Sequence, residues 1–140
     1  MTPRPADVAV GTELPEQTFQ VTRADLIRYA GASGDFNVIH WNDRVAREVG
    51  LPGVIAHGML TAGLAIRAVT GWTGDPGAVV DYQVRFSRPV VVPDDDTGAE
   101  VTVRGRIAAL LDDGRVRVDL TVTSGGEKVL SLARAVVALS

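Results

Sequence analysis

The sequence predicts an α+β fold in which an antiparallel sheet curls around one long helix. Two observations support this fold. Residues 56–72 are almost uncharged and apolar nearly all the way round a helix, which indicates a helix surrounded by protein. From about residue 78 the spacing of apolar residues changes from helical to alternating. One early strand, then helices, then four consecutive strands is an α+β order, and the helix can cover the single apolar face of the sheet.

The chain has the size and composition of a single folded domain. It has 140 residues, of which 46% are hydrophobic and 22% charged, with no visible repeat or linker. We therefore expect one domain over residues 1–140. Because cysteine is absent, no disulfide, thiolate metal site or thiol nucleophile can form.

Charge and hydropathy argue against several kinds of partner. The net charge of -3, with no basic cluster, gives no reason to expect nucleic acid or an anionic membrane. The longest apolar run, Met59 to Val69, is shorter than the roughly 20 residues that a bilayer requires. The first residues contain no apolar export signal, so we expect a cytoplasmic protein.

The first half of the chain predicts a strand followed by two capped helices. A short alternating strand is expected from Gln17 to Val21, and Thr22 with Asp25 three residues later is a variant of the capping box. Gly31 and Gly34 mark the end of the first helix. Asn42 is the expected N-cap of a second helix over residues 43–49, which Gly50 and Pro52 terminate. The segment between these helices, residues 35–40, is too irregular for a regular element.

The second half predicts four strands, at about residues 78–88, 100–111, 115–124 and 128–139. In the third, alternate residues are apolar and should face the core: Val116, Val118, Leu120 and Val122. Asp113-Gly114 and Gly125-Gly126 are strong hairpin signals. The run Asp94-Asp95-Asp96 fits a solvated loop better than a metal site. Arg67, the single charge on the long helix, needs a partner or a route to solvent, because an isolated buried charge is very costly.

Few residues are available for catalysis, and they gather in two places. Asp35 and His40 share the irregular segment, and five residues of non-helical chain can bring both side chains to one substrate carbon for proton transfer. Spacing alone also allows Asp35 to be a turn or capping residue and His40 an ordinary surface histidine. The other histidine, His57, is interpreted as a residue that hydrogen-bonds the preceding loop. The Gly58 amide, at the start of the long helix, lacks a partner within the helix and could stabilise negative charge on a substrate oxygen.

Several stretches of the sequence resemble a known family. The run Tyr-Ala-Gly-Ala-Ser-Gly-Asp-Phe-Asn-Val-Ile-His, which starts at Tyr29, is similar to the signature of MaoC-like (R)-specific hydratases and dehydratases. The start of that family's central helix is similar to residues 56–61. Residues 74–79 with 84–86 resemble in particular the HadB subunit of the actinobacterial (3R)-hydroxyacyl-ACP dehydratase. The resemblance covers nearly the whole chain.

The resemblance implies a hot-dog fold, a curved antiparallel sheet wrapped around one long helix, whose sheets pair edge to edge in dimers. It places the catalytic acid–base pair on Asp35 and His40, the signature asparagine on Asn37, and the backbone amide that stabilises an oxyanion on Gly58. It requires neither a metal nor a redox cofactor. One departure is Val38, which stands where the family usually has proline.

The implied activity is dehydration of (3R)-hydroxyacyl thioesters, or hydration of trans-2-enoyl thioesters, in fatty-acid or related acyl-chain metabolism. The acyl chain would be carried on acyl-carrier protein or coenzyme A. The expected assembly is a homodimer, or a heterodimer with a HadA- or HadC-like subunit.

Two other functions remain open. A hot-dog thioesterase would share the fold and the thioester substrates, but thioesterases, like the other type of hot-dog dehydratase, typically carry a carboxylate on the central helix. This chain has no Asp or Glu between Glu48 and Asp75, which counts against both. A non-catalytic partner subunit would be free to lose the acid and the imidazole, whereas this chain retains both.

Overall fold

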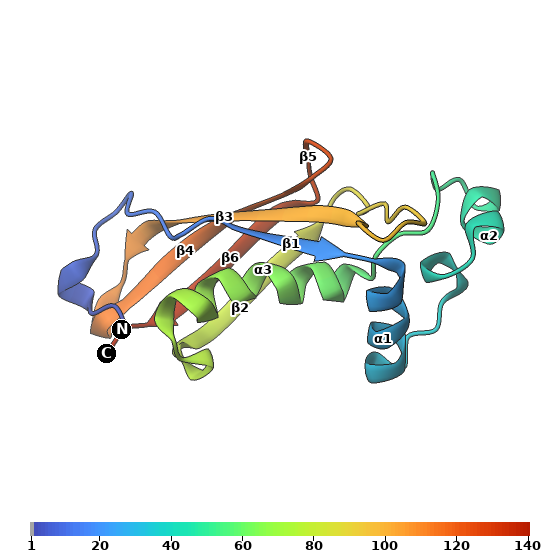
Figure 1. The fold of residues 1–140 in the computed structure, drawn as a ribbon. Coiled ribbons are helices and arrows are strands. Elements are labelled where there is room, and N and C mark those ends of the chain that lie inside the picture. The colour runs from blue at the N-terminus through green and yellow to red at the C-terminus, as the bar shows by residue number, and fades with distance from the viewer. Residues whose placement is uncertain (1) are drawn as a thin grey trace.

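The computed structural model describes residues 2–140 as a curved antiparallel sheet with one long helix on its concave side (Figure 1). The helices are α1 (Arg23–Ser33), α2 (Asp43–Glu48) and α3 (Gly58–Thr73), with 3-10 turns η1 (Pro5–Asp7), η2 (Val38–His40), η3 (Pro76–Ala78) and η4 (Asp112–Gly114). The strands are β1 (Gln17–Val21), β2 (Val79–Phe86), β3 (Ala99–Leu110), β4 (Arg115–Ser124), β5 (Glu127–Lys128) and β6 (Leu130–Ala138).

The sheet has the order β1-β3-β4-β6-β2, with β5 paired to β4. Its core is built by the alternation predicted from the sequence, since the four apolar side chains of β4 are buried: Val116, Val118, Leu120 and Val122. The turn between β3 and β4 places Asp113 and Gly114 at φ angles of 59° and 71°. Positive φ at both central residues is what an Asp-Gly hairpin turn requires.

The predicted start of α1 is confirmed in atomic detail. The Asp25 amide donates to Thr22 Oγ1 at 3.3 Å, and Asp25 Oδ2 accepts from the Thr22 amide at 2.9 Å, which completes the capping box. Of the two glycines expected to mark its end, Gly31 lies within the helix, and the helix ends at Gly34, which has a left-handed φ of 77° and donates its amide to Ala30 O.

The long helix differs from its prediction in two respects. It begins at Gly58 rather than near Ala56, because the Ala56 amide donates to Val90 O at 2.9 Å and the chain there is extended. Nor is α3 surrounded by protein. The sheet covers one face, while Met59 is 62% exposed and Arg67 also lies in the open. Arg67 therefore needs no buried counter-charge, and its guanidinium lies 5.0 Å from the centroid of the Phe19 ring.

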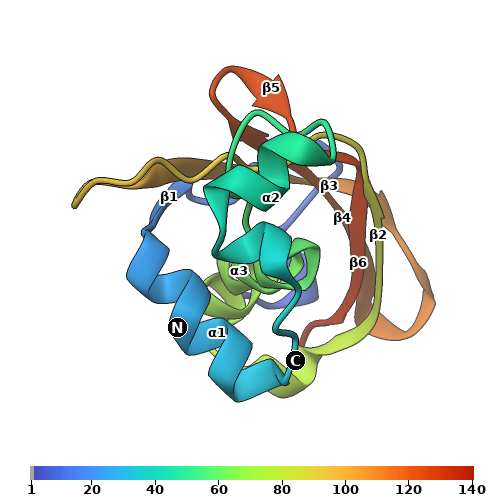
Figure 2. The same ribbon diagram turned by 90° about the vertical axis from the view of Figure 1, so that its right-hand side faces the viewer.

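The helices α1 and α2 and the turn η2 form a layer across one end of the curved sheet, beside the N-terminus of α3 (Figure 2). Arg23 fastens this layer, because its Nε donates to Val92 O at 2.7 Å and its Nη2 contacts Asp43 at 3.1 Å. Asp43 Oδ1 also accepts the Val54 amide at 3.0 Å. That hydrogen bond, and then Arg23, hold the pKa of the Asp43 carboxyl below its usual value. The segment between α1 and α2 is thus anchored on both sides.

Within residues 2–140 no helix combines the length and the apolar character that crossing a bilayer demands.

Candidate active site

The segment that carries Asp35 is shaped by bonds between neighbouring residues. The Asp35 amide donates to Ser33 Oγ, the Asn37 amide to Asp35 Oδ1, and the Ile39 amide to Asn37 Oδ1, each at 3.2 Å. Asp35 is therefore a turn residue, one of the roles that its spacing allows, and Asn37 is the N-cap of η2. Because the turn uses Oδ1, the other carboxylate oxygen of Asp35 is left to face His40.

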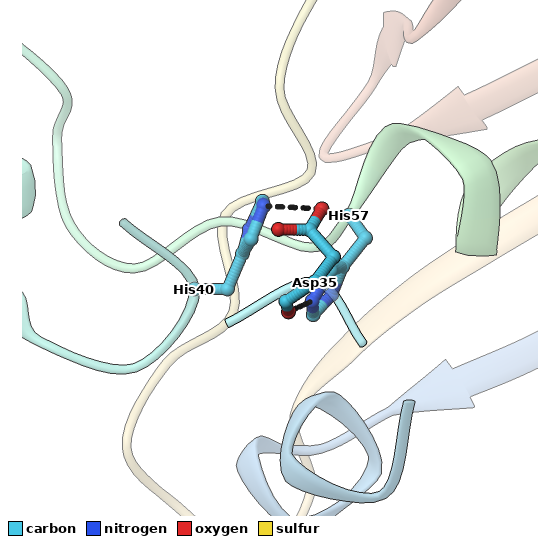
Figure 3. Close-up of side chains that lie close together, drawn as sticks. All are labelled: Asp35, His40 and His57. Atoms are coloured by element: carbon cyan, nitrogen blue, oxygen red, sulfur yellow. Dashed lines mark hydrogen bonds and ion pairs between the residues drawn. The ribbon is translucent and has the colours of Figure 1, made fainter. Parts of the chain in front are cut away.

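His40 is buried, and the hydrogen bond at one ring nitrogen orients the other. Its Nδ1 lies 2.7 Å from Ile55 O. A carbonyl oxygen only accepts, so Nδ1 carries the proton in the neutral ring and Nε2 presents its lone pair. Nε2 lies 3.8 Å from Asp35 Oδ2 (Figure 3). The structure thus brings Asp35 and His40 together, with His40 7% exposed as a residue and the Asp35 side chain half-exposed.

His57 lies against the same pair. Its Nε2 donates to Asp35 O at 3.1 Å, so it does hydrogen-bond the preceding loop, as expected. What the sequence did not reveal is the packing of its ring. The His57 ring stacks on the His40 ring, with centroids 3.8 Å apart and planes inclined by 22°, and it meets the Tyr29 ring edge-on. The available sequence signal was that the second of only two histidines stands directly before Gly58.

Burial lowers the pKa of the His57 imidazole, since its residue is only 1% exposed. The nearby His40 also lowers this pKa, whereas the bond to Asp35 O and the Asp35 charge act in the opposite direction and are outweighed. His57 is therefore neutral near pH 7. Among the described residues, its Nδ1 atom is buried without a hydrogen-bond partner.

A cavity of about 330 Å³ opens beside His40. Its wall includes Gly58, the first residue of α3, and Thr61, together with Phe86 and Arg88 from the strand end opposite. Gly58 is one of the N-terminal helix residues whose amides lack an acceptor in the helix, and it lies at the positive end of the helix dipole. A β-carbon at Gly58 would lie 3.0 Å from Phe86 Cε1, so glycine lets the two segments approach closely.

The same three side chains are near enough to raise the question of a metal. One ligand atom each of Asp35, His40 and His57 lie within 4.8 Å of one another. However, one nitrogen of each imidazole ring already donates a hydrogen bond to a backbone carbonyl oxygen. The two rings are stacked and nearly parallel, so lone pairs in their planes do not converge on one point, as tetrahedral or octahedral coordination needs. The geometry therefore does not favour a metal centre. In the acidic loop, Asp95 Oδ1 accepts the amides of Thr97 and Gly98, which fits a turn.

Comparison with known proteins gives the family. The model of the MaoC-like domain matches residues 7–125. The chain belongs to the MaoC-like family. The resemblance found in the sequence is thereby confirmed. A solved structure of a MaoC-like dehydratase superposes on 99% of the chain with a TM-score of 0.95 and 44% identity, covering 43% of that protein. Together with the observed sheet around α3, this confirms the hot-dog fold.

Two curated MaoC-like relatives have assigned activities. The chain is 37% identical to the 3-hydroxyacyl-thioester dehydratase X of Mycobacterium tuberculosis over 98 residues, which are 64% of this chain and 34% of that protein. It is 34% identical to the 3-hydroxybutyryl-CoA dehydratase of Methylorubrum extorquens over 128 residues, 89% of this chain and 76% of that protein. This MaoC-like chain thus spans about a third of the first relative's length and most of the second's.

Proposed function

We propose that this MaoC-like chain dehydrates (3R)-hydroxyacyl thioesters and, in reverse, hydrates trans-2-enoyl thioesters, in fatty-acid or related acyl-chain metabolism. The observation that carries the proposal is the pairing of Asp35 Oδ2 with His40 Nε2 beside a cavity that His40 and Gly58 line. The activities named for the two relatives support it.

The chemistry follows from which atoms are free. In the neutral ring, the proton of His40 lies on Nδ1, which donates to Ile55 O, so Nε2 has a lone pair with which to remove a proton from C2 of the substrate. The C2–H electrons form the C2–C3 double bond as the C3–O bond breaks, and the departing hydroxyl takes the proton that His40 removed from C2 and leaves as water. Asp35 Oδ2, together with His40, holds that hydroxyl. In hydration the same groups act in the opposite order.

The Gly58 amide would complete the site by donating to the thioester carbonyl oxygen. Negative charge develops on that oxygen as the C2 proton leaves, and a donor placed in advance at a helix N-terminus stabilises it. Neither a metal nor a redox cofactor takes part in this scheme. The acyl carrier would be acyl-carrier protein or coenzyme A, both of which present the same thioester.

The test is the absorbance of the enoyl thioester. Purified protein added to crotonyl-CoA or a longer trans-2-enoyl thioester should remove this absorbance while releasing no free thiol, and the product should be the (3R)-hydroxyacyl thioester. Release of thiol instead would identify a thioesterase. Unchanged absorbance and thiol with coenzyme A and acyl-carrier-protein substrates, tested with the chain alone and with HadA- or HadC-like partners, would refute the proposal.

We propose also that the chain forms a dimer, with itself or with a HadA- or HadC-like subunit. The strand β2 lies at the end of the strand order, and its residues Val80 and Phe86 are 47% and 51% exposed. An edge strand of this length is a template for pairing with another chain. Light scattering on the purified protein should give twice the chain mass for a homodimer. A monomer that acquires a partner only on co-expression would indicate the heterodimer.

The thioesterase reading receives no support from the helix. The described face of α3 that borders the cavity supplies Gly58 and Thr61, and the carboxylate nearest His40 comes from the loop. A non-catalytic role would leave the convergence of Asp35 and His40 without a purpose.

A further inference from the structure

The Asp35 carboxylate is held by few bonds from outside its own turn. Its amide and its Oδ1 atom bond to Ser33 and Asn37, each two residues away. Its backbone carbonyl, in contrast, accepts a hydrogen bond from His57, which lies 22 residues further along the chain. The loop that carries the acid is thus tied to the start of α3 through the His57 side chain.

We infer that His57 is a positioning residue for the Asp35–His40 pair. It donates Nε2–H to Asp35 O, and its ring stacks against the His40 ring. This inference rests on the proposed function. It gives His57 no contact with the substrate, since its residue is 1% exposed and does not line the cavity.

The hydrogen bond from His57 to Asp35 O positions the backbone of Asp35, and the stacking of the His57 ring positions the His40 ring. Asp35 O and the Asp35 side chain leave from adjacent backbone atoms, so a shift of the carbonyl carries the carboxylate with it. The hydrogen bond from Nδ1 to Ile55 O holds one side of the His40 ring, and the His57 ring, whose centroid is 3.8 Å away, limits rotation of the His40 ring about its Cβ–Cγ bond. Both partners of the 3.8 Å Asp35–His40 pair therefore depend on one side chain.

The charge state of His57 suits this role. The groups that face it are His40 from η2, Asp35 from the loop and Tyr29 from α1. A neutral ring lets His40 take up a substrate proton without a second positive charge 3.8 Å away. Burial favours this neutral form. A proton added at His57 Nδ1 would also find no acceptor among the described residues.

Two amide substitutions separate the hydrogen bond from other effects. In His57→Gln the amide nitrogen can reach the place of Nε2 and still donate to Asp35 O. In His57→Asn the same amide is one methylene shorter and ends near the place of Nδ1. Both variants lose the ring, so the difference between them reports the bond to Asp35 O.

With a trans-2-enoyl thioester as substrate, we expect kcat of His57→Asn to fall roughly 100-fold, the effect of a displacement of about 1 Å in an active site. KM should change little, because His57 does not contact substrate. His57→Gln should retain about tenfold more kcat than His57→Asn, which is the worth of one ordinary hydrogen bond. Equal kcat in the two variants, or wild-type kcat in His57→Asn, would overturn the inference.

A readout without activity separates this inference from the proposed function. In nitrogen-15 NMR of the wild type near pH 7, His57 should appear as the neutral Nε2–H tautomer. Amide exchange over residues 35–40 should be faster in His57→Asn than in His57→Gln. If the wild type hydrates no thioester but His57 is the neutral Nε2–H tautomer and amide exchange differs as expected, the proposed function is refuted while the hydrogen bond from His57 to the Asp35 loop is supported. A charged His57 in the wild type, or amide exchange in His57→Asn equal to that of the wild type, would refute the positioning role of His57.

Discussion

The loop from Asp35 to His40 and the sheet beneath α3 are built in opposite ways. The sheet is held by long ladders and by aliphatic side chains that are completely buried, such as Val103, Ile107 and Val118. The loop has polar side chains that cap its own turns, and its Asp35 carboxylate is half-exposed. Stability therefore resides mainly in the sheet, whereas the chemistry depends on a few short contacts. Substitutions in the two regions should have separable effects.

The largest effect is expected from removing the pair itself. Asp35→Asn and His40→Ala should each lower kcat for enoyl-thioester hydration by about 10²- to 10⁴-fold, because each removes a group that transfers or directs a proton. The midpoint of urea unfolding should change little in Asp35→Asn, since the amide keeps an oxygen for the Asn37 amide. Full activity in both purified variants would show that the site lies elsewhere.

The converse change is Ile107→Ala in β3. The Ile107 side chain is 0% exposed, and its removal should lower the free energy of unfolding by about 2–5 kcal/mol through lost burial and a new cavity. At a temperature where the variant is still folded, kcat should stay close to the wild-type value. A large loss of kcat with intact stability would contradict the separation of the two regions.

Acid should destabilise the protein through His57. Because burial lowers the pKa of His57 in the folded state, the unfolded chain takes up this proton first as the pH falls below the ordinary value of 6.5. The stability that depends on His57 being uncharged is fully present above pH 6.5, and it is lost as the pH falls from 6.5 to the lower pKa of His57 in the folded state. Its slope is at most about 1.4 kcal/mol per pH unit for one proton. Urea unfolding at several pH values should show this slope in the wild type and a reduced slope in His57→Gln.

The smallest effect is expected from Val38→Pro, which introduces the residue that the family resemblance implies at this position. Val38 is the first residue of η2, and the preceding Asn37 has a ψ of 130°, an extended conformation that proline tolerates in its neighbour. We expect a gain of about 0.4–1 kcal/mol in the free energy of unfolding, since proline restricts the unfolded chain. A loss of stability would show that the Val38 amide or side chain is needed in the loop.

The features that sequence predicted well are those fixed by neighbouring residues. The β4 strand and its buried face follow from alternation, and the ends of α1 follow from Thr22, Asp25 and Gly34. The missed features depend on segments distant in sequence. The helix α3 starts two residues later than predicted because the Ala56 amide donates to Val90 O. Met59 is exposed because the sheet covers only one face of α3.

The site shows the same division. Five residues of irregular chain suggested that Asp35 and His40 could meet, and the capping role of Asn37 is local. The stack of His57 on His40 joins two segments that only the folded chain brings together. The roles of Asp35, His40, Asn37 and Gly58 in catalysis, and the extent of the domain over residues 1–140, stay predictions.

The contact between Gly58 and Phe86 has an evolutionary consequence. Since a β-carbon at Gly58 would lie only 3.0 Å from Phe86 Cε1, a larger residue at position 58 requires the Phe86 ring to shift, and the two positions should vary together. In an alignment of relatives, alanine at the first position should occur mainly in chains that carry a smaller residue at the second. Two residues that line the cavity, one on the helix start and one on the strand end, would then have diversified as one unit, so that the shape of the cavity and the size of the residue at position 58 change together.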